Sequence, residues 1–383
     1  MVFNMRYLDE RVWVILRELR PLIERQHIDI TKWQTKKKLF MRPEEADQDS
    51  MPWEAFDSST DRWYGKDVYY WFRAQFTVPQ SMDGKCIFLK IHTQIEEWDD
   101  GRNPQFLLFV DGKAVQGQDM NHREVRLTDC AEAGRTYTLD LQAYTGILHN
   151  EFALKVTADE TDLALLKLYY DLKAPADAYH YKRMPEGRTR SLLIEALNGA
   201  INKLDLRNPH SPEFDASVAE AQAYIDEHLY QNPELIGHDE IIASCIGHTH
   251  IDVAWWWTVS QTREKTARSF STVLKLMDEY PDYKFMSSQP QLYVFLKERY
   301  PEVYAKIKER VKEGRWIPEG GMWLEADCNL TSGESLVRQF LYGKKFFKDE
   351  FDIDSKILWL PDVFGYSAAI PQILKKSGVD KFV

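Results

Sequence analysis

The feature that most constrains the fold is a strand-then-helix rhythm that fills the last third of the chain. Short apolar runs, each typical of a buried strand, alternate with amphipathic stretches of helical period. The expected strands lie at 241–246, 283–288, 315–317 and 357–360, and a fifth begins at 381. Repeated strand–helix units predict a parallel sheet or barrel with right-handed crossovers. The carboxyl ends of such strands carry the functional groups.

A period of two dominates an earlier part of the chain. Residues 70–78 and 136–143 alternate apolar and polar side chains, and Asp111-Gly112 supplies a tight turn after another apolar run. These strands predict an antiparallel sandwich. Helical spacing returns between 161 and 230, where Ser211-Pro212 is typical of a helix start.

We therefore expect a multidomain α+β protein, because 383 residues exceed one ordinary core. Its expected parts are an N-terminal helical or irregular segment over 1–62, an antiparallel β-sandwich over 63–160, a helical connector over 161–236, and the first part of a β/α barrel over 237–383. The rhythm stops inside the expected sheet, and an unpaired apolar edge is unfavourable. We accordingly expect a fragment of a longer protein.

Composition and charge exclude several classes of partner. A net charge of −11 argues against nucleic acid and against an anionic membrane surface. No signal peptide and no apolar run long enough for a bilayer is visible. The four cysteines lack paired spacing, which predicts a reducing compartment and cytoplasmic localisation. The sequence leaves the oligomeric state open, a homo-oligomer included.

A cluster of metal-ligating side chains follows the first expected strand of the rhythm. His248, His250 and Asp252 occupy alternate positions, so they point to the same side of an extended chain. Imidazole nitrogen beside carboxylate oxygen is a ligand set suited to zinc. His248 is either a ligand like the other two or a partner that orients a neighbouring ligand.

Three consecutive indoles follow that cluster. Trp255 is nearest to the candidate ligands and is the best platform for a sugar ring. The three cannot all face the same way, and Trp256 and Trp257, taken singly, are expected in the core.

Two further segments reach the same expected rim. Asp362 follows the fourth strand and is either a third ligand or nucleophile, or only a helix N-cap. The loop over 319–329 follows the third strand and contains Gly320-Gly321, which permits a close approach of the backbone to a ligand. Its Glu325 and Asp327 are either acceptors for a substrate or solvated acids. Residues 287–289, which end the second strand, are equally ambiguous.

The segments 248–255, 319–329 and 360–367 together resemble the catalytic domain of glycoside hydrolase family 38 α-mannosidases, nearest to the cytosolic and vacuolar branch. The resemblance covers about 237–383 and implies a zinc-dependent retaining exo-α-mannosidase with a (β/α)7-type barrel, whose substrate is a terminal α-mannoside of an oligosaccharide. It also implies roles for residues that match the family's motifs: zinc ligands His250, Asp252 and Asp362, the last also the nucleophile, and substrate contacts Trp255 and Asp327.

The departures from the family pattern carry an expectation of their own. The family's last zinc ligand, a histidine, and its general acid lie further along the chain than Val383, and no histidine follows His250. We expect this chain to hold zinc weakly or not at all and to lack mannosidase activity by itself. Metal-dependent turnover of an aryl α-mannoside, lost with Asp362→Asn, would contradict that expectation.

Two other classes compete with the mannosidase. A metal-dependent amidohydrolase or deacetylase also uses a metal pair on a strand, but it would need histidines on later strands. A non-enzymatic carbohydrate-binding module would suit the sandwich, but it leaves the cluster around His250 unexplained.

Overall fold

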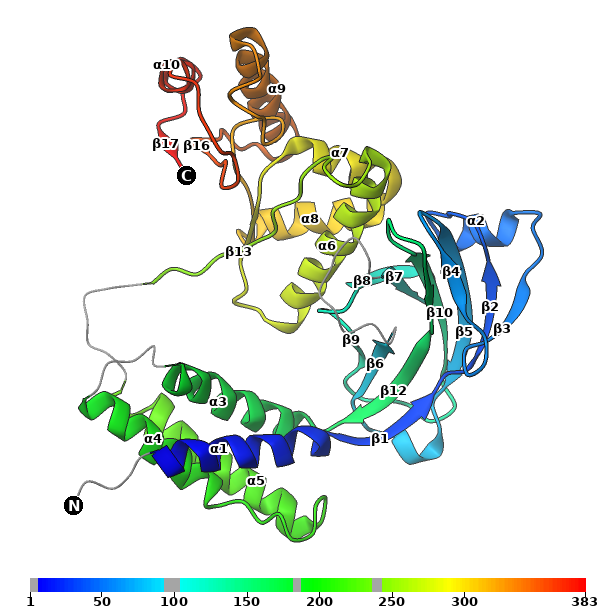
Figure 1. Ribbon diagram of the computed structural model, residues 1–383, viewed down its shortest axis with the longest axis vertical. Coiled ribbons are helices and arrows are strands. Elements are labelled where there is room, and N and C mark those ends of the chain that lie inside the picture. Colours follow the sequence, from blue (N-terminus) through cyan, green and yellow to red (C-terminus); the bar gives the residue numbers. More distant parts are fainter. Residues whose placement is uncertain (1–5, 93–103, 182–186, 236–242) are drawn as a thin grey trace.

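The computed structural model describes residues 6–92, 104–181, 187–235 and 243–383 as a mixed α/β protein with several antiparallel sheets (Figure 1). Strands from the first 161 residues form the curved sheets, one group of helices lies together at the end where α1 and α3 are labelled, and a second group lies beside strands β7 and β8. The expected α+β class is confirmed at this coarse level.

Two antiparallel sheets and one small ribbon make up the β part. The six-stranded sheet has the order β3 (Glu54–Asp57), β2 (Lys32–Lys36), β5 (Tyr69–Thr77), β10 (Thr136–Tyr144), β7 (Gln105–Val110) and β8 (Lys113–Gln118). The four-stranded sheet has the order β1 (Glu24–Asp29), β12 (Lys155–Thr161), β6 (Ile87–His92) and β9 (Glu124–Thr128). The ribbon pairs β11 (Asn150–Phe152) with β4 (Trp63–Gly65).

The period of two in β5 builds two different cores. Trp71 and Phe72 are adjacent and both fully buried, and they point to opposite faces of the sheet. Phe72 belongs to the core enclosed between the two sheets, whereas Trp71 belongs to a core that includes helices from beyond residue 258. The expected antiparallel sandwich is therefore present, and its outer face is covered as well.

Residues 1–62 differ from the expected helical or irregular segment, because they supply β1, β2 and β3 to these sheets. All three lie at or next to a sheet edge. An edge strand is exposed along one side, so β1 carries charged residues without strict alternation, as Glu24-Arg25-Gln26-His27 shows. The domain limits themselves stay predictions.

A helical bundle shares one apolar core. Its members are α1 (Arg6–Leu19), α3 (Leu163–His180), α4 (Arg188–Ile201) and α5 (Pro212–Ile225), with short turns at Arg20–Leu22 and Asp226–Tyr230. The predicted helix start at Ser211-Pro212 is confirmed, because the Ser211 hydroxyl accepts a hydrogen bond of 3.2 Å from the backbone N–H of Phe214. Two short helices lie in the sheet region: α2 (Pro43–Gln48) and Gln80–Met82.

The strand–helix rhythm after residue 243 forms parallel pairs. A three-stranded sheet has the order β13 (Gly247–His248), β14 (Phe285–Ser287) and β15 (Trp316–Pro318), and β16 (Ile357–Leu358) pairs with β17 (Lys381–Phe382). A single bridge from Gly320 to Leu358 links the two. The helices are α6 (Val259–Glu279), α7 (Pro290–Arg299), α8 (Pro301–Lys312), α9 (Gly333–Phe351) and α10 (Ile370–Lys376). Closure of these strands into a barrel stays a prediction.

The first expected strand of the rhythm is wrong in its position. Residues 243–246 are exposed and form no strand, and pairing starts at Gly247; residues 241 and 242 lie outside the described residues. The neighbouring strand explains the shift. β14 begins only at Phe285, after the turn at Pro281, so the register that pairs Gly247 with Phe285 offers residues 243–246 no strand as a partner.

The six-stranded sheet packs directly against α6. Their shared core contains Trp71, Leu107 and Phe109 of the sheet together with Phe270 and Phe285. The contact is close at Gly117, whose backbone N–H donates a 3.1 Å hydrogen bond to the Thr272 hydroxyl. Among the described residues, no helix combines the length and the apolar character that crossing a bilayer requires.

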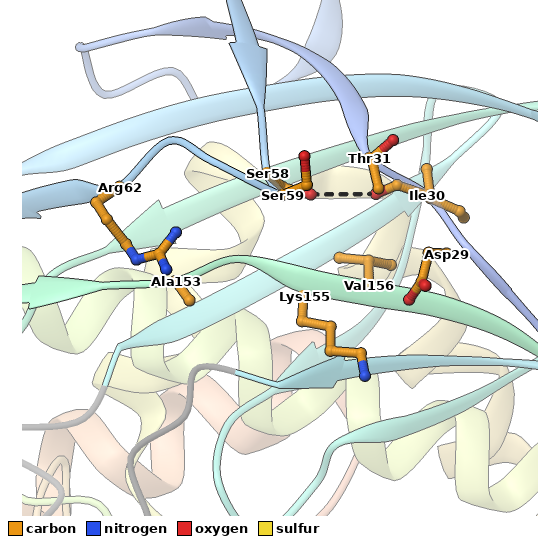
Figure 2. A pocket seen from close by; sticks show the side chains of 9 residues that line it. All are labelled: Asp29, Ile30, Thr31, Ser58, Ser59, Arg62, Ala153, Lys155 and Val156. Atoms are coloured by element: carbon orange, nitrogen blue, oxygen red, sulfur yellow. Dashed lines mark hydrogen bonds between the residues drawn. The ribbon is translucent and has the colours of Figure 1, made fainter.

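A polar hollow of about 220 Å³ opens on the sandwich (Figure 2). Its buried floor is formed by Ile30, Ala153 and Val156, and the charged chains of Arg62 and Lys155 stand at its side. The Arg62 guanidinium donates to the carbonyl of Asp61 at 2.9 Å, so it is partly engaged by its own loop.

Candidate metal centre

The parallel pairing brings three separate loops to one rim. His250 follows β13, Gln289 follows β14, and the loop that contains Glu325 follows β15. The bridge from Gly320 to Leu358 adds the segment after β16, which contains Asp362. Side chains far apart in the sequence therefore meet where the strands end, as in other parallel β/α sheets.

His250 is the centre of this rim. Its Nε2 lies 3.3 Å from Oδ1 of Asp252 and 3.4 Å from Oδ2 of Asp362. Its Nδ1 lies 2.8 Å from Oε2 of Glu325. One imidazole therefore faces three carboxylates, two on one ring nitrogen and one on the other. The three residues predicted as metal ligands are brought together by the structure.

The surrounding acids control the charge of His250. The carboxylate of Glu325 is the main influence and, with Asp252, raises the pKa of the imidazole to about 9 against the opposing effect of burial. Without a metal ion the ring is therefore protonated at neutral pH. A metal ion would have to displace that proton, because only the neutral imidazole is a ligand.

His248 is differently placed, because both of its ring nitrogens have partners. Its Nδ1 lies 3.0 Å from the carbonyl oxygen of Met286, so that nitrogen carries the proton, and its Nε2 accepts a 3.1 Å hydrogen bond from the indole N–H of Trp359. Although His248 lies near His250 and Glu325, no lone pair is left for a metal. This geometry fits the supporting role considered from the sequence.

The donor set at His250 fits a divalent metal ion. His250, Asp252 and Asp362 offer one nitrogen and two carboxylates within 4.8 Å of one another, and imidazole nitrogen and carboxylate oxygen are both ligand types that Zn²⁺ accepts. Nδ1 of His250 and Oε2 of Glu325 are buried and lack a well-directed hydrogen bond despite their short separation. A carboxylate behind the imidazole of a metal-bound histidine is the usual orienting partner.

Glu325 is the member of the site that the sequence did not single out from its loop. Its side chain is only 5% exposed, and its Oε1 accepts a 2.9 Å hydrogen bond from the Ser288 hydroxyl. The sequence placed both Glu325 and Asp327 in the loop after β15 as acceptors, but loop residues lack a period that would tell which one points inward.

Asp327 lies outside the cluster around His250. It is exposed, and its Oδ1 accepts hydrogen bonds from the backbone N–H groups of Asn329 at 2.9 Å and Leu330 at 3.1 Å. The carboxylate thus stabilises a turn of its own loop. Its predicted contact with the substrate stays a prediction.

The three indoles lie beside the cluster in a loop before α6. Trp255 is 66% exposed, as a sugar platform requires. Trp256 is 71% exposed and stacks on Trp255 with ring centroids 5.1 Å apart, so the expectation that it lies in the core is wrong. Trp257 is half-buried, and its indole N–H donates to the carbonyl of Asp252 at 3.1 Å. Hydrogen bonding and ring stacking within the loop replace core packing.

An imidazole and carboxylates at the ends of parallel β/α strands are the arrangement in which enzymes of this architecture place their functional groups. Residues 240–383 match the model of the glycosyl hydrolases family 38 N-terminal domain. This part of the chain therefore belongs to glycosyl hydrolase family 38, and the expected family is confirmed.

The similarity to known relatives extends beyond residues 240–383, into the sandwich and the helices that precede the β/α region. The chain is 31% identical to alpha-mannosidase G of Dictyostelium discoideum over 82% of this chain and 29% of that protein. It is 31% identical to human alpha-mannosidase 2C1 over 89% of this chain and 32% of that protein. It is 36% identical to the alpha-mannosidase of Saccharomyces cerevisiae over 58% of this chain and 21% of that protein. The chain thus spans about a third of the length of the relatives it matches, or less.

Among solved structures, the chain is similar to a β-glucuronidase from Ruminococcus gnavus, with 10% identity and a TM-score of 0.26 over 37% of this chain and 30% of that chain. That likeness is too slight to define a shared fold.

Proposed function

We propose that this chain contributes the metal-binding part of a zinc-dependent retaining exo-α-mannosidase, which hydrolyses terminal α-mannosides of oligosaccharides. The observation that carries the proposal is the meeting of Asp252 and Asp362 at Nε2 of His250, at 3.3 and 3.4 Å. Membership of glycosyl hydrolase family 38 and the names of the relatives support the substrate class.

Each residue has a proposed role. His250, Asp252 and Asp362 would hold Zn²⁺, which when bound supplies Lewis-acid polarisation and a charge that sugar hydroxyls can contact. Glu325 orients the His250 ring through Nδ1. Trp255 offers its exposed indole face to the mannose ring, and Asp327 is the proposed second substrate contact.

Asp362 is also the proposed nucleophile, and its side chain is half exposed and open to a ligand. Its free carboxylate oxygen attacks the anomeric carbon, the bond from that carbon to the glycosidic oxygen breaks, and a carboxylic acid protonates the leaving oxygen. The resulting mannosyl ester is then hydrolysed by water with return of the proton. Two inversions at the anomeric carbon retain its configuration.

Zinc binding by this chain tests the metal part. Zn²⁺ is titrated against a chromophoric chelator with wild type and with His250→Ala, Asp252→Asn and Asp362→Asn. We expect each substitution to weaken binding by more than about tenfold, because each removes a ligand rather than an orienting partner. Glu334→Gln, an exposed acid on α9, is the matched control and should bind as wild type. Measurable zinc binding with equal affinity in all five proteins would refute the site.

Sugar binding tests the mannose part. Methyl α-mannoside and methyl α-glucoside differ only at the 2-hydroxyl, so a mannose site should distinguish them. We expect a zinc-dependent change in indole fluorescence with the mannoside, a weaker one with the glucoside, and neither with Trp255→Ala. An identical response to both sugars would reject the proposed substrate.

The alternatives gain no observation of their own. A metal-dependent amidohydrolase would use further imidazoles, and the histidine that the described residues group with His250, His248, has both ring nitrogens engaged. The hollow on the sandwich is lined without any aromatic ring, so it lacks a stacking platform for a sugar (Figure 2). The cytoplasm remains the proposed location, supported by four free cysteines.

A further inference from the structure

We infer that Gln289 is a positioning residue for the candidate metal centre, holding the Glu325 carboxylate and the His250 strand end in register with each other. This inference rests on the metal site proposed above. It concerns the segment 287–289, whose sequence alone did not reveal a role.

The backbone of Gln289 is the first observation. It has φ 62° and ψ 81°, a left-handed conformation that residues other than glycine rarely adopt. Pro290 follows, and a residue before proline prefers an extended backbone, which adds to the strain. Gln289 as a whole is 3% exposed, so hydration of the residue does not stabilise this left-handed backbone. Strain of this kind persists where the surroundings over-determine it, often at functional sites.

The side-chain amide of Gln289 is the second observation, because it joins two other segments. Its Nε2 donates a 2.9 Å hydrogen bond to the carbonyl of Ile251, and its Oε1 accepts one of 3.3 Å from the backbone N–H of Glu325. Nε2 also lies 3.4 Å from Oε1 of Glu325. One amide therefore contacts both the segment after β13 and the loop after β15.

The position of these contacts gives them a consequence for the metal centre. Ile251 stands between His250 and Asp252, and Glu325 faces Nδ1 of His250. The strands that carry these segments are only two or three residues long, so their backbone ladders fix little beyond the strand ends. The Gln289 amide links the segment after β13 to the loop after β15, a link that the short ladders do not provide. The strained backbone of Gln289 is the conformation that directs the amide toward both segments.

Only a glutamine side chain can hydrogen-bond with all three partner atoms, which are the Ile251 carbonyl oxygen, the Glu325 backbone nitrogen and Oε1 of Glu325. Glutamate would keep the acceptor for the Glu325 N–H but lose the donor to Ile251, and it would set a second carboxylate against Glu325. Asparagine tolerates the left-handed backbone but is one methylene shorter. Alanine keeps the backbone strain without the amide, and glycine removes both.

Amide hydrogen exchange reads the cross-link without any metal. The Glu325 N–H is the donor to Gln289, so Gln289→Ala, Gln289→Gly and Gln289→Asn should speed its exchange about tenfold or more, whereas Gln289→Glu should keep much of its protection. Gln289→Gly should melt at a higher temperature than Gln289→Ala, since it relieves the left-handed strain. Gln291→Ala is the matched control: the Gln291 side chain accepts a 3.2 Å hydrogen bond from the Trp323 indole of the same loop and hydrogen-bonds neither Ile251 nor Glu325.

Zinc affinity then separates a positioning role from a purely structural one. We expect Gln289→Ala and Gln289→Gly each to bind Zn²⁺ about tenfold more weakly than wild type, because loss of an orienting partner costs that much in metal affinity. The two variants should lose the same amount of affinity although their melting temperatures differ. Gln291→Ala should bind normally. Unchanged Glu325 exchange in Gln289→Ala would overturn the inference, and so would faster exchange with unaltered zinc affinity. If wild type binds no zinc, this chain does not form the metal site by itself, and the exchange result alone decides the cross-link.

Discussion

The sandwich and the β/α region solve the same problem of holding strands together in opposite ways. In the sandwich, β5 and β10 pair over nine residues in unbroken register. In the β/α region, β13 pairs with β14 over two residues and β14 with β15 over three. Long ladders satisfy the backbone by themselves, whereas short ones need support from elsewhere.

That support comes from side chains and from the sandwich. Single side chains such as Gln289 and His248 connect neighbouring strand ends around the candidate metal centre. The outer face of the six-stranded sheet packs on α6, whose first turn follows directly on the loop with Trp255. The sandwich therefore supports the β/α region, and the candidate metal centre lies in the β/α region, whose short strands need that support.

The largest expected effect tests this dependence with two adjacent residues of β5. Trp71→Ala and Phe72→Ala each remove a fully buried aromatic ring and should each lower the free energy of unfolding by about 3–5 kcal/mol. Trp71 faces α6 and Phe72 faces the sandwich interior. Only Trp71→Ala should also speed native-state amide exchange in α6.

Urea unfolding gives the stability and exchange gives the location, so each variant serves as the control for the other. Should Phe72→Ala loosen α6 as much as Trp71→Ala does, the β/α region would not depend on the sheet face that it touches. Equal exchange in α6 in wild type and Trp71→Ala would lead to the same conclusion.

A smaller effect is expected where β8 meets α6 most closely. A Cβ added at Gly117 would stand 2.7 Å from the backbone oxygen of Arg268, so the sheet and helix would have to separate. We expect Gly117→Ala to lower the free energy of unfolding by about 1–3 kcal/mol, measured by urea denaturation.

Gly333→Ala at the exposed start of α9 is the matched control, because a Cβ there meets nothing within 4 Å. It should change stability by less than about 0.5 kcal/mol. Similar values for both glycine variants would mean that the spacing between sheet and helix is adjustable.

The sequence predicted the fold best where one physical signal dominated. The strict alternation of β5 and β10 located them almost to the residue, and the helix start at Ser211-Pro212 was found because serine is a favourable N-cap. Edge strands such as β1 escaped, since one exposed side blurs the alternation. The strand at 241–246 was misplaced because pairing depends on where the neighbour begins, which lies outside any local window.

The residues of the candidate site also divide into those that the sequence predicted and those that it did not. His250, Asp252 and Asp362 stand next to strands, where the position in the chain predicts the position at the rim. Glu325 and Gln289 lie in loops and act through contacts with distant segments, at 2.8 Å to His250 and 2.9 Å to Ile251. No period of the sequence encodes such contacts, so only the three-dimensional arrangement reveals them.

The smallest expected effect concerns an ionic support within the β/α region. Glu350 of α9 accepts from Lys297 of α7 at 2.5 Å and from Tyr304 of α8 at 2.8 Å. Burial alone would raise the pKa of Glu350, but hydrogen bonds from Lys297, Tyr304 and Lys308 outweigh it and lower the pKa to about 2. Because the folded pKa lies below the unfolded one, the stabilisation is present above about pH 4.3 and is lost as the pH falls toward 2.

Glu350→Gln should therefore cost about 1 kcal/mol at pH 7, discounted for the solvent that reaches the two lysines, and should flatten the pH dependence between 5 and 2. Chemical denaturation across that range measures both. Asp349→Asn removes the neighbouring carboxylate of an exposed pair with Lys345 and should change little at any pH. If the two variants have the same pH profile, the acid between the three helices is an ordinary surface charge, and the β/α region is held by its apolar contacts and short ladders without this ionic support.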